Sequence, residues 1–147
     1  TYHQSISLNL VFRLMTILRS KQTGRLFDAP LDVKLDEENI VQPDIIYVEN
    51  EKQAIITPKC IEGIPDIIVE ILSAGSVSYD RKEKMDLYHR FKVPEYWIVD
   101  PANQSIEIYE WKDTYYDLYT IAEQKGEMTS KLQPQFVINI EEIFAQL

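Results

Sequence analysis

Two carboxylates and one lysine are the residues in this chain best suited to chemistry at a phosphate group. Asp44 follows a proline and precedes an apolar run, Glu70 lies inside the most apolar run of the chain, and Lys84 lies on the apolar side of a predicted helix. Carboxylate oxygens are hard ligands that suit Mg²⁺ or Mn²⁺, and an ammonium group can orient water or stabilise developing negative charge. The set therefore predicts metal-assisted hydrolysis of a phosphodiester bond.

Glu70 is the strongest of these signals because its neighbours are apolar. Residues 67–72 are nearly all Ile, Val or Leu, a pattern typical of a strand that is covered on both faces. A buried carboxylate is costly unless it is paired or binds a cation. Glu70 is therefore either a metal ligand or one half of a structural salt bridge.

Lys84 heads the apolar stripe of a helix predicted over residues 80–91, because apolar residues follow it at three, four and seven positions. Such a lysine either extends its ammonium group to solvent at the helix end or points toward the preceding strand, where Glu70 lies. Asp80 and Glu83 have the spacing of a capping box, so we expect Asp80 to begin this helix.

A second acid on the Glu70 strand, Asp66, is too far away to share an ion with Glu70. Four strand residues separate them by roughly 13 Å, at ~3.3 Å per residue. Asp44, on a neighbouring strand, is the better companion for Glu70. Asp66 is then expected to act as a turn cap or to mark the start of the strand.

The pattern along the chain predicts a single domain over residues 1–147, because domains of this length bury a substantial core. Apolar residues at helical spacing predict helices over 4–21, 80–91 and 140–146. Alternating or continuous apolar runs predict strands over 25–29, 31–35, 40–48, 65–72, 95–100 and 127–132, and a hairpin formed by 105–111 and 115–123.

Charge and composition restrict the classes of function. The net charge of −9 argues against a protein that binds nucleic acid through a simple basic face, but not against an enzyme whose acidic pocket is neutralised by metal ions. One cysteine, Cys60, excludes an internal disulfide and suits a reducing cytoplasm. No apolar run approaches the ~18 residues of a membrane span, so we expect a cytoplasmic protein with no membrane partner.

Other catalytic chemistries lack their motifs. The sequence contains no glycine-rich phosphate loop, no serine nucleophile elbow and no paired Cys/His spacing for zinc. His3 and His89 are too few for a histidine-based metal site, and we expect both on the surface.

The order and spacing of several short motifs resemble the Uma-two family of restriction-endonuclease-like proteins, a branch of the PD-(D/E)XK nuclease superfamily. The resemblance covers about residues 3–120. It rests on Pro43-Asp44, on PDIIVEILS at 65–73, on DRKEK at 80–84 with Tyr88, on VPEYWIVD at 93–100, and on His3-Gln4 with Ile6-Ser7 and Leu10 in the first helix.

The resemblance implies an α/β (α+β) fold with a restriction-endonuclease-like mixed central β-sheet flanked by helices and a C-terminal hairpin region. It also implies that Asp44 and Glu70 are metal ligands. In the wider superfamily the lysine follows the second acid by two residues, a position that Leu72 occupies here. Lys84 occupies the matching place on the following helix. A further acid that some relatives carry near the N-terminus is absent, since residues 1–27 contain no Asp or Glu.

Two functions are therefore in competition. The first is a Mg²⁺-dependent (or Mn²⁺-dependent) endonuclease that cuts DNA, working as a homodimer because two cuts in a duplex are most easily made by a two-fold pair of sites. The second is a non-catalytic interaction or dimerisation module that retains a nuclease fold. The second is motivated by the charge of −9 and by the lack of an acid in the first helix.

Overall fold

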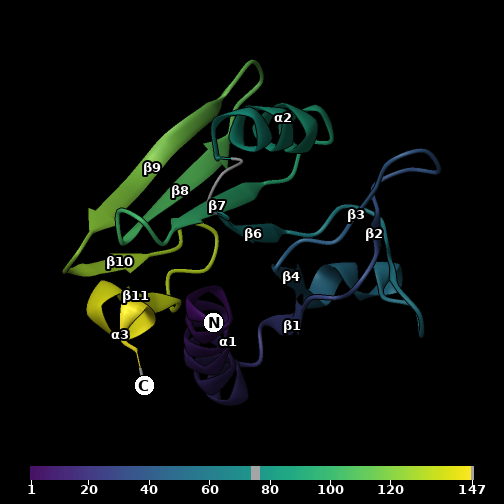
Figure 1. Cartoon of the computed structure of the whole chain (residues 1–147). Helices are drawn as coiled ribbons and strands as arrows, with labels where there is room; N and C mark the ends of the chain where they lie inside the picture. The colour runs from purple at the N-terminus through teal and green to yellow at the C-terminus, as the bar shows by residue number, and fades with distance from the viewer. Residues whose placement is uncertain (74–76, 147) are drawn as a thin grey trace.

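A mixed six-stranded sheet forms the centre of the computed structural model, which describes residues 1–73 and 77–146 except for the side chains of 77–80 (Figure 1). In spatial order its strands are β1 (Gly24–Asp28), β4 (Ile45–Glu49), β6 (Ile67–Ile71), β7 (Glu95–Asp100), β8 (Ser105–Trp111) and β9 (Tyr116–Glu123). Strands β6 and β7 pair in parallel, and the other neighbours pair antiparallel. The predicted mixed sheet is confirmed, and the C-terminal hairpin of β8 and β9 belongs to it.

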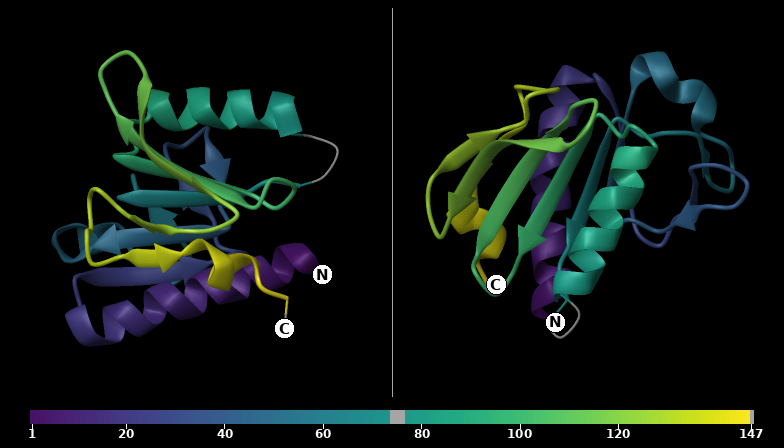
Figure 2. Two further views of the ribbon diagram at one scale, coloured as in Figure 1. Left: turned by 90° about the vertical axis from the view of Figure 1, so that its left-hand side faces the viewer. Right: turned by 90° about the horizontal axis from the view of Figure 1, so that it is seen from above.

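Helices cover both faces of this sheet. Helix α1 (Tyr2–Lys21) and the short α3 (Ile140–Phe144) lie on one face, and α2 (Val77–Arg90), which connects β6 to β7, lies on the other (Figure 2). Three small elements surround them: a sheet of β3 (Ile40–Val41), β2 (Val33–Lys34) and β5 (Ile61–Glu62), a 3₁₀ helix (Asn50–Ile55), and a pair formed by β10 (Glu127–Thr129) and β11 (Val137–Asn139). No helix in the described ranges has the length and apolar character needed to cross a membrane.

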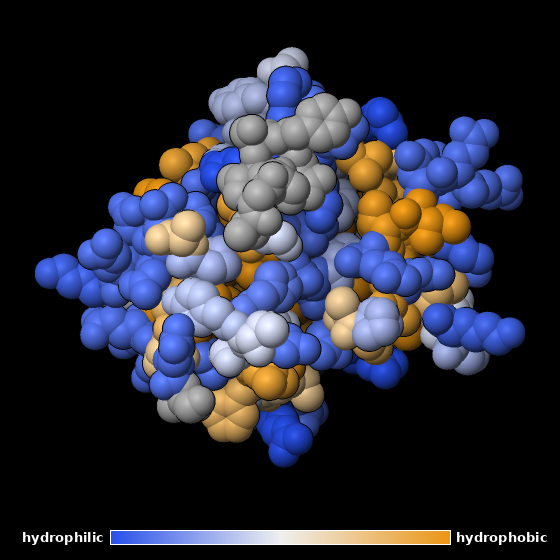
Figure 3. Space-filling view, viewed as in Figure 1, coloured by the Kyte–Doolittle hydropathy of each residue, from blue (hydrophilic) through white to orange (hydrophobic). Residues whose placement is uncertain are grey.

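Two apolar clusters hold these layers together, and β6 contributes to both. On the α1 face, Ile6 and Leu10 pack in a cluster with Val69 of β6. On the α2 face, Tyr88 packs in a cluster with Ile68. Every residue of β6 is buried, which explains its continuous apolar sequence. The outer surface seen in Figure 3 is mainly hydrophilic, with smaller separate apolar patches.

Several element boundaries differ from those predicted, and the three largest differences in the first 90 residues are these. Helix α2 begins at Val77, so Asp80 lies within the helix and does not start it, and the Asp80 side chain lies outside the described part of the chain. The strand predicted over 40–48 is divided into β3 and β4 around Pro43, which has no N–H for a strand ladder. The strand predicted over 31–35 is reduced to the two residues of β2.

The carboxylate of Glu95, the first residue of β7, links the sheet to the segment after β10. It is buried and accepts hydrogen bonds from Trp97 Nε1 at 2.7 Å and Ser130 Oγ at 2.6 Å. It also accepts from the backbone N–H groups of Lys131 and Leu132, at 3.1 and 3.0 Å. One carboxylate thus satisfies donors from two distant parts of the chain.

We expect Glu95→Gln to lower the free energy of unfolding by about 1–3 kcal/mol, because an amide group offers fewer acceptor sites to these buried donors. Urea unfolding followed by circular dichroism measures the change. The control is Glu127→Gln at an exposed position on β10, which should change stability by less than about 0.5 kcal/mol. Equal stability of the two variants would contradict the expectation.

Candidate active site

Asp44 and Glu70 lie at the same end of two neighbouring strands. Strands β4 and β6 pair antiparallel with Ile45 opposite Val69. Continuing this register by one residue places Asp44, just before β4, opposite Glu70. Because alternate strand residues share a face, both carboxylates lie on the face that α2 covers. The register of the sheet therefore brings together two acids that are 26 residues apart in the sequence.

The carboxylate of Asp44 is held in place by the backbone of β6. The N–H of Ile71 donates to Asp44 Oδ2 at 2.7 Å. On the same oxygen, Nε2 of His3 approaches to 3.9 Å from the first turn of α1. The Asp44 side chain is 22% exposed, so it is held on one side and open to solvent on the other.

Helix α2 supplies two partners for the buried Glu70 carboxylate. Lys84 Nζ lies 3.3 Å from Glu70 Oε2, and the hydroxyl of Tyr88 donates to the same oxygen at 2.6 Å. Lys84 and Tyr88 are four residues apart, so they project from the same side of the helix. The side chain of Glu70 is 6% exposed and that of Lys84 is 41% exposed. Lys84 thus points toward Glu70, and this contact equally meets the requirement of a structural salt bridge.

The electrostatic environment leaves the ionised form of Glu70 incompletely compensated. Burial raises the pKa of Glu70, and the charge of Lys84 and the hydrogen bond from Tyr88 oppose this increase. The negative charge of Asp44 adds to the increase, as expected for two neighbouring carboxylates. Burial and the charge of Glu70 also raise the pKa of Tyr88, which keeps its phenol protonated as a donor.

Asp66 and Leu72 flank β6 at its two ends, and neither belongs to the group formed by Asp44, Glu70 and Lys84. Asp66 accepts a hydrogen bond from the N–H of Glu49 at 2.8 Å and pairs with Lys52 at 3.2 Å, so its contacts are structural. Leu72 donates its N–H to the carbonyl of Val99 at 2.8 Å. The position that carries the lysine in the wider superfamily is thus an aliphatic residue here, and Lys84 reaches Glu70 from α2.

Both histidines are partly exposed, as expected of surface residues, but each also contacts another part of the protein. His3 reaches the Asp44 carboxylate, whereas His89 lies 2.7 Å from the carbonyl of Lys112, which follows β8. A signal for His3 was present in the sequence. It precedes Ile6 by three residues, so it lies at the start of the buried stripe of α1.

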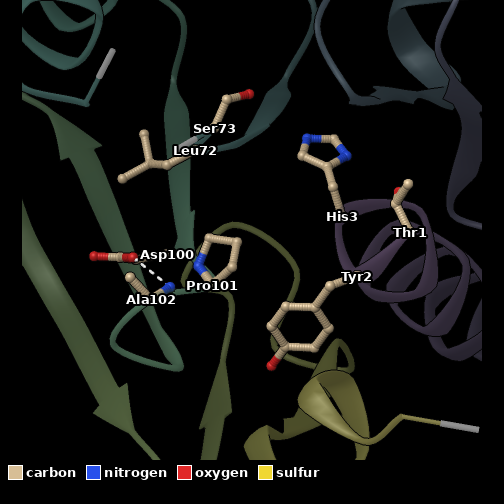
Figure 4. A pocket seen from close by; sticks show the side chains of 8 residues that line it. All are labelled: Thr1, Tyr2, His3, Leu72, Ser73, Asp100, Pro101 and Ala102. Carbon is tan, nitrogen blue, oxygen red and sulfur yellow. Dashed lines mark hydrogen bonds between the residues drawn. The ribbon is translucent and has the colours of Figure 1, made fainter. Parts of the chain in front are cut away.

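A pocket of about 630 Å³ opens next to this cluster, where the parallel strands β6 and β7 end (Figure 4). Tyr2 and His3 line it from α1, Leu72 and Ser73 from the segment after β6, and Asp100 from the end of β7. The carboxylate of Asp100 accepts the N–H of Ala102 at 3.0 Å and so caps a turn. His3 lines the pocket and also lies 3.9 Å from Asp44, so the pocket adjoins the candidate site, whereas Asp44, Glu70 and Lys84 are not among its lining residues.

The donor chemistry of the site fits a hard divalent cation. Within residues 1–73 and 77–146, no group of three His, Cys, Asp or Glu side chains is placed to hold a metal ion. The carboxylates of Asp44 and Glu70 nevertheless share one face, and oxygen ligands of this kind suit Mg²⁺ and Mn²⁺. Such ions commonly take their remaining ligands from water and from substrate phosphate.

We expect Lys84→Met to raise the pKa of Glu70 further, because the neighbouring positive charge that lowers it is removed. Carbon-13 NMR titration of the glutamate carboxyl groups measures this change. A carboxyl group with a raised pKa binds its proton more tightly when folded, so its contribution to stability falls as pH rises through the native pKa. In the variant this loss should therefore extend to higher pH.

The matched control is Lys82→Met on the same helix. Lys82 pairs with Asp86 at 3.1 Å, and both side chains are exposed. This variant should leave the titration of Glu70 unchanged. Tyr88→Phe removes the hydroxyl donor and should raise the pKa of Glu70 as well. An unchanged Glu70 titration in Lys84→Met would contradict the electrostatic description of the site.

Comparison with known proteins identifies the family and a similar fold. A family model named Uma2, with the description "Putative restriction endonuclease", matches residues 1–141. The fold is similar to that of a crystal structure from Anabaena variabilis ATCC 29413, described as a putative nuclease belonging to DUF820, with a TM-score of 0.73 and 16% sequence identity. The match covers 98% of this chain and 80% of the other. No curated protein matches the chain. The length of the family match shows that this chain belongs to the Uma2 family.

Proposed function

We propose that this protein is an endonuclease that uses a divalent cation to hydrolyse phosphodiester bonds in DNA. One observation carries the proposal: the convergence of Asp44, Glu70 and Lys84, from three different elements, at the same end of β6. Two acids and a cation at this end, beside an open pocket, are suited to the charge changes of phosphodiester hydrolysis. Membership of the Uma2 family supports the same reaction class.

Asp44 and Glu70 are the residues that would hold the cation, Mg²⁺ or Mn²⁺. When bound, the ion supplies positive charge to the phosphate oxygens and to the attacking water. The N–H of Ile71 fixes one oxygen of Asp44 and leaves the exposed part of the carboxylate available. The raised pKa of Glu70 supports this assignment, because a bound cation would stabilise its ionised form.

Lys84 would act on the water or on the charge that develops at phosphorus. The Glu70 carboxylate holds its ammonium group on one side, and the half-exposed side chain leaves the other side open to a substrate. Tyr88 restrains the carboxylate that positions Lys84, through its hydrogen bond to the same oxygen. Although the lysine lies on α2 and not on the strand, its ammonium group is still 3.3 Å from the Glu70 carboxylate.

Basic side chains near the site make DNA binding compatible with the overall charge of −9. Arg81 lies three residues before Lys84 on α2, and its Nη2 donates to Glu107 Oε1 of β8 at 2.8 Å. Arg81 is 31% exposed, so part of its guanidinium group can face a phosphate. We include a two-fold homodimer in the proposal, because two such sites could cut both strands of a duplex.

The test is cleavage of supercoiled and linear DNA by the purified protein with Mg²⁺ or Mn²⁺. Asp44→Asn, Glu70→Gln and Lys84→Met should each lower the cleavage rate by about a hundredfold or more, because each removes charge stabilisation from the transition state. A chelator should abolish cleavage. Lys82→Met, on the exposed side of α2, should cut at the wild-type rate.

Two outcomes would contradict the proposal. Cleavage that persists in all three site variants would show that the activity arises elsewhere. A folded protein that cuts neither DNA substrate and binds no divalent cation in calorimetry would favour the non-catalytic interaction module. In that case the contact between Glu70 and Lys84 would be a structural ion pair.

A further inference from the structure

The imidazole of His3 faces two oxygen atoms at the candidate site. Its Nε2 lies 3.3 Å from the carbonyl oxygen of Ile71 and 3.9 Å from Oδ2 of Asp44. The same Ile71 peptide donates its N–H to Asp44 Oδ2 at 2.7 Å. One nitrogen and two oxygens, contributed by α1, β6 and the residue before β4, thus converge on a small volume.

The contact of His3 with the Ile71 carbonyl is a long hydrogen bond, and its contact with Asp44 Oδ2 is beyond hydrogen-bond length. N–H···O bonds in proteins are commonly about 2.9–3.0 Å long, and both contacts exceed this length. By contrast, two ligands in adjacent positions on an octahedral ion with bonds of about 2.1 Å lie about 3.0 Å apart, and opposite ligands about 4.2 Å apart. The distances of 3.3 and 3.9 Å fall between these values. The imidazole nitrogen is therefore separated from each of the two oxygens by a distance within the range spanned by pairs of ligands on one cation.

We propose that His3 is a metal ligand that acts together with the Asp44 carboxylate and the Ile71 carbonyl, an inference that rests on the proposed metal-dependent function. An imidazole ligand changes which ion the site prefers. Carboxylate, carbonyl and water oxygens suit Mg²⁺, whereas imidazole nitrogen favours first-row transition ions. His3 thus gives the site a preference for Mn²⁺ and Co²⁺ over Mg²⁺.

His3 also gives helix α1 a ligand at the site, although the helix carries no acid. Residues 1–27 contain no Asp or Glu, so α1 can offer the site no carboxylate. Its first turn instead brings the imidazole to Asp44, and the buried Ile6 and Leu10 hold this face of the helix against the sheet. The carboxylate of Glu70, which the strand register places opposite Asp44, adds negative charge that attracts a cation.

Binding measurements at one pH near 7.5 separate a ligand from a structural bridge. In His3→Gln the side-chain amide can still donate to the Ile71 carbonyl, but it offers no imidazole nitrogen. Isothermal titration calorimetry should show that this variant binds Co²⁺ and Mn²⁺ about tenfold or more weakly, since even partners outside the ligand sphere contribute 10–100-fold. Its affinity for Mg²⁺ should change far less.

The chain has two histidines, which provides a matched control and a spectroscopic assay. A histidine bound directly to Co²⁺ shows ring-proton NMR signals shifted far outside the normal proton range. The wild-type protein with Co²⁺ should show one such set of signals. His89→Gln should retain it, because His89 contacts the Lys112 carbonyl after β8, and His3→Gln should lose it.

The outcomes separate this inference from the proposed function. Unchanged Co²⁺ and Mn²⁺ affinities in His3→Gln, with binding lost in Asp44→Asn, would overturn the role of His3 and leave the metal-dependent nuclease intact. Shifted signals that survive in His3→Gln would overturn it in the same way. Absence of divalent-metal binding in the folded wild-type protein would overturn both proposals.

Discussion

The burial of the Glu70 carboxylate sets a requirement that the packing of α2 against β6 has to meet. Strand β6 is buried over its whole length, so a carboxylate in it loses nearly all of its hydration. The loss is tolerable only if partners come from elsewhere, and α2 supplies them as Lys84 and Tyr88. The packing of α2 against β6 therefore has to satisfy a charge as well as an apolar surface.

This arrangement has little value as a source of stability. The cost of desolvating a buried ion pair commonly equals or exceeds the Coulombic gain, and an apolar replacement of similar volume is often as stable. The α1 face of the sheet shows the simpler solution, since the β6 residues packed there, Val69 among them, are apolar. The proposed chemistry would account for an acid, a lysine and a phenol on the α2 face, which stability alone does not require.

The position of the cluster also follows from the way the strands end. The parallel pair β6 and β7 ends beside the open pocket, and β4 begins at the same point with Asp44 immediately before it. There the N–H of Ile71 bonds to a side chain, and its carbonyl faces His3. The site thus combines two strands, the crossover helix and the first turn of α1, and ligands in α/β proteins commonly bind beyond the carboxyl ends of parallel strands.

Sequence patterns were enough to show which residues carry charge into apolar surroundings. Glu70 was identifiable because a strand of Ile and Val leaves no other reason for an acid, and Lys84 because it lies on an apolar helical stripe. The mixed sheet and the family were likewise recognisable, because their motifs keep a fixed order. Local patterns of this kind depend only on neighbours a few residues away. They can therefore be recognised before the fold is known.

Which of these residues come into contact depends on how the helices and strands pack. Strand register places Asp44 opposite Glu70. The packing of α1 against the sheet brings His3 to Asp44, although the sequence around His3 does not predict contact with an acid. Helix α2 begins at Val77 and not at Asp80, because a capping pattern at Asp80 does not exclude a helix that begins earlier. Contacts between residues far apart in the chain depend on how whole elements pack, and periodicity within one element does not contain that information.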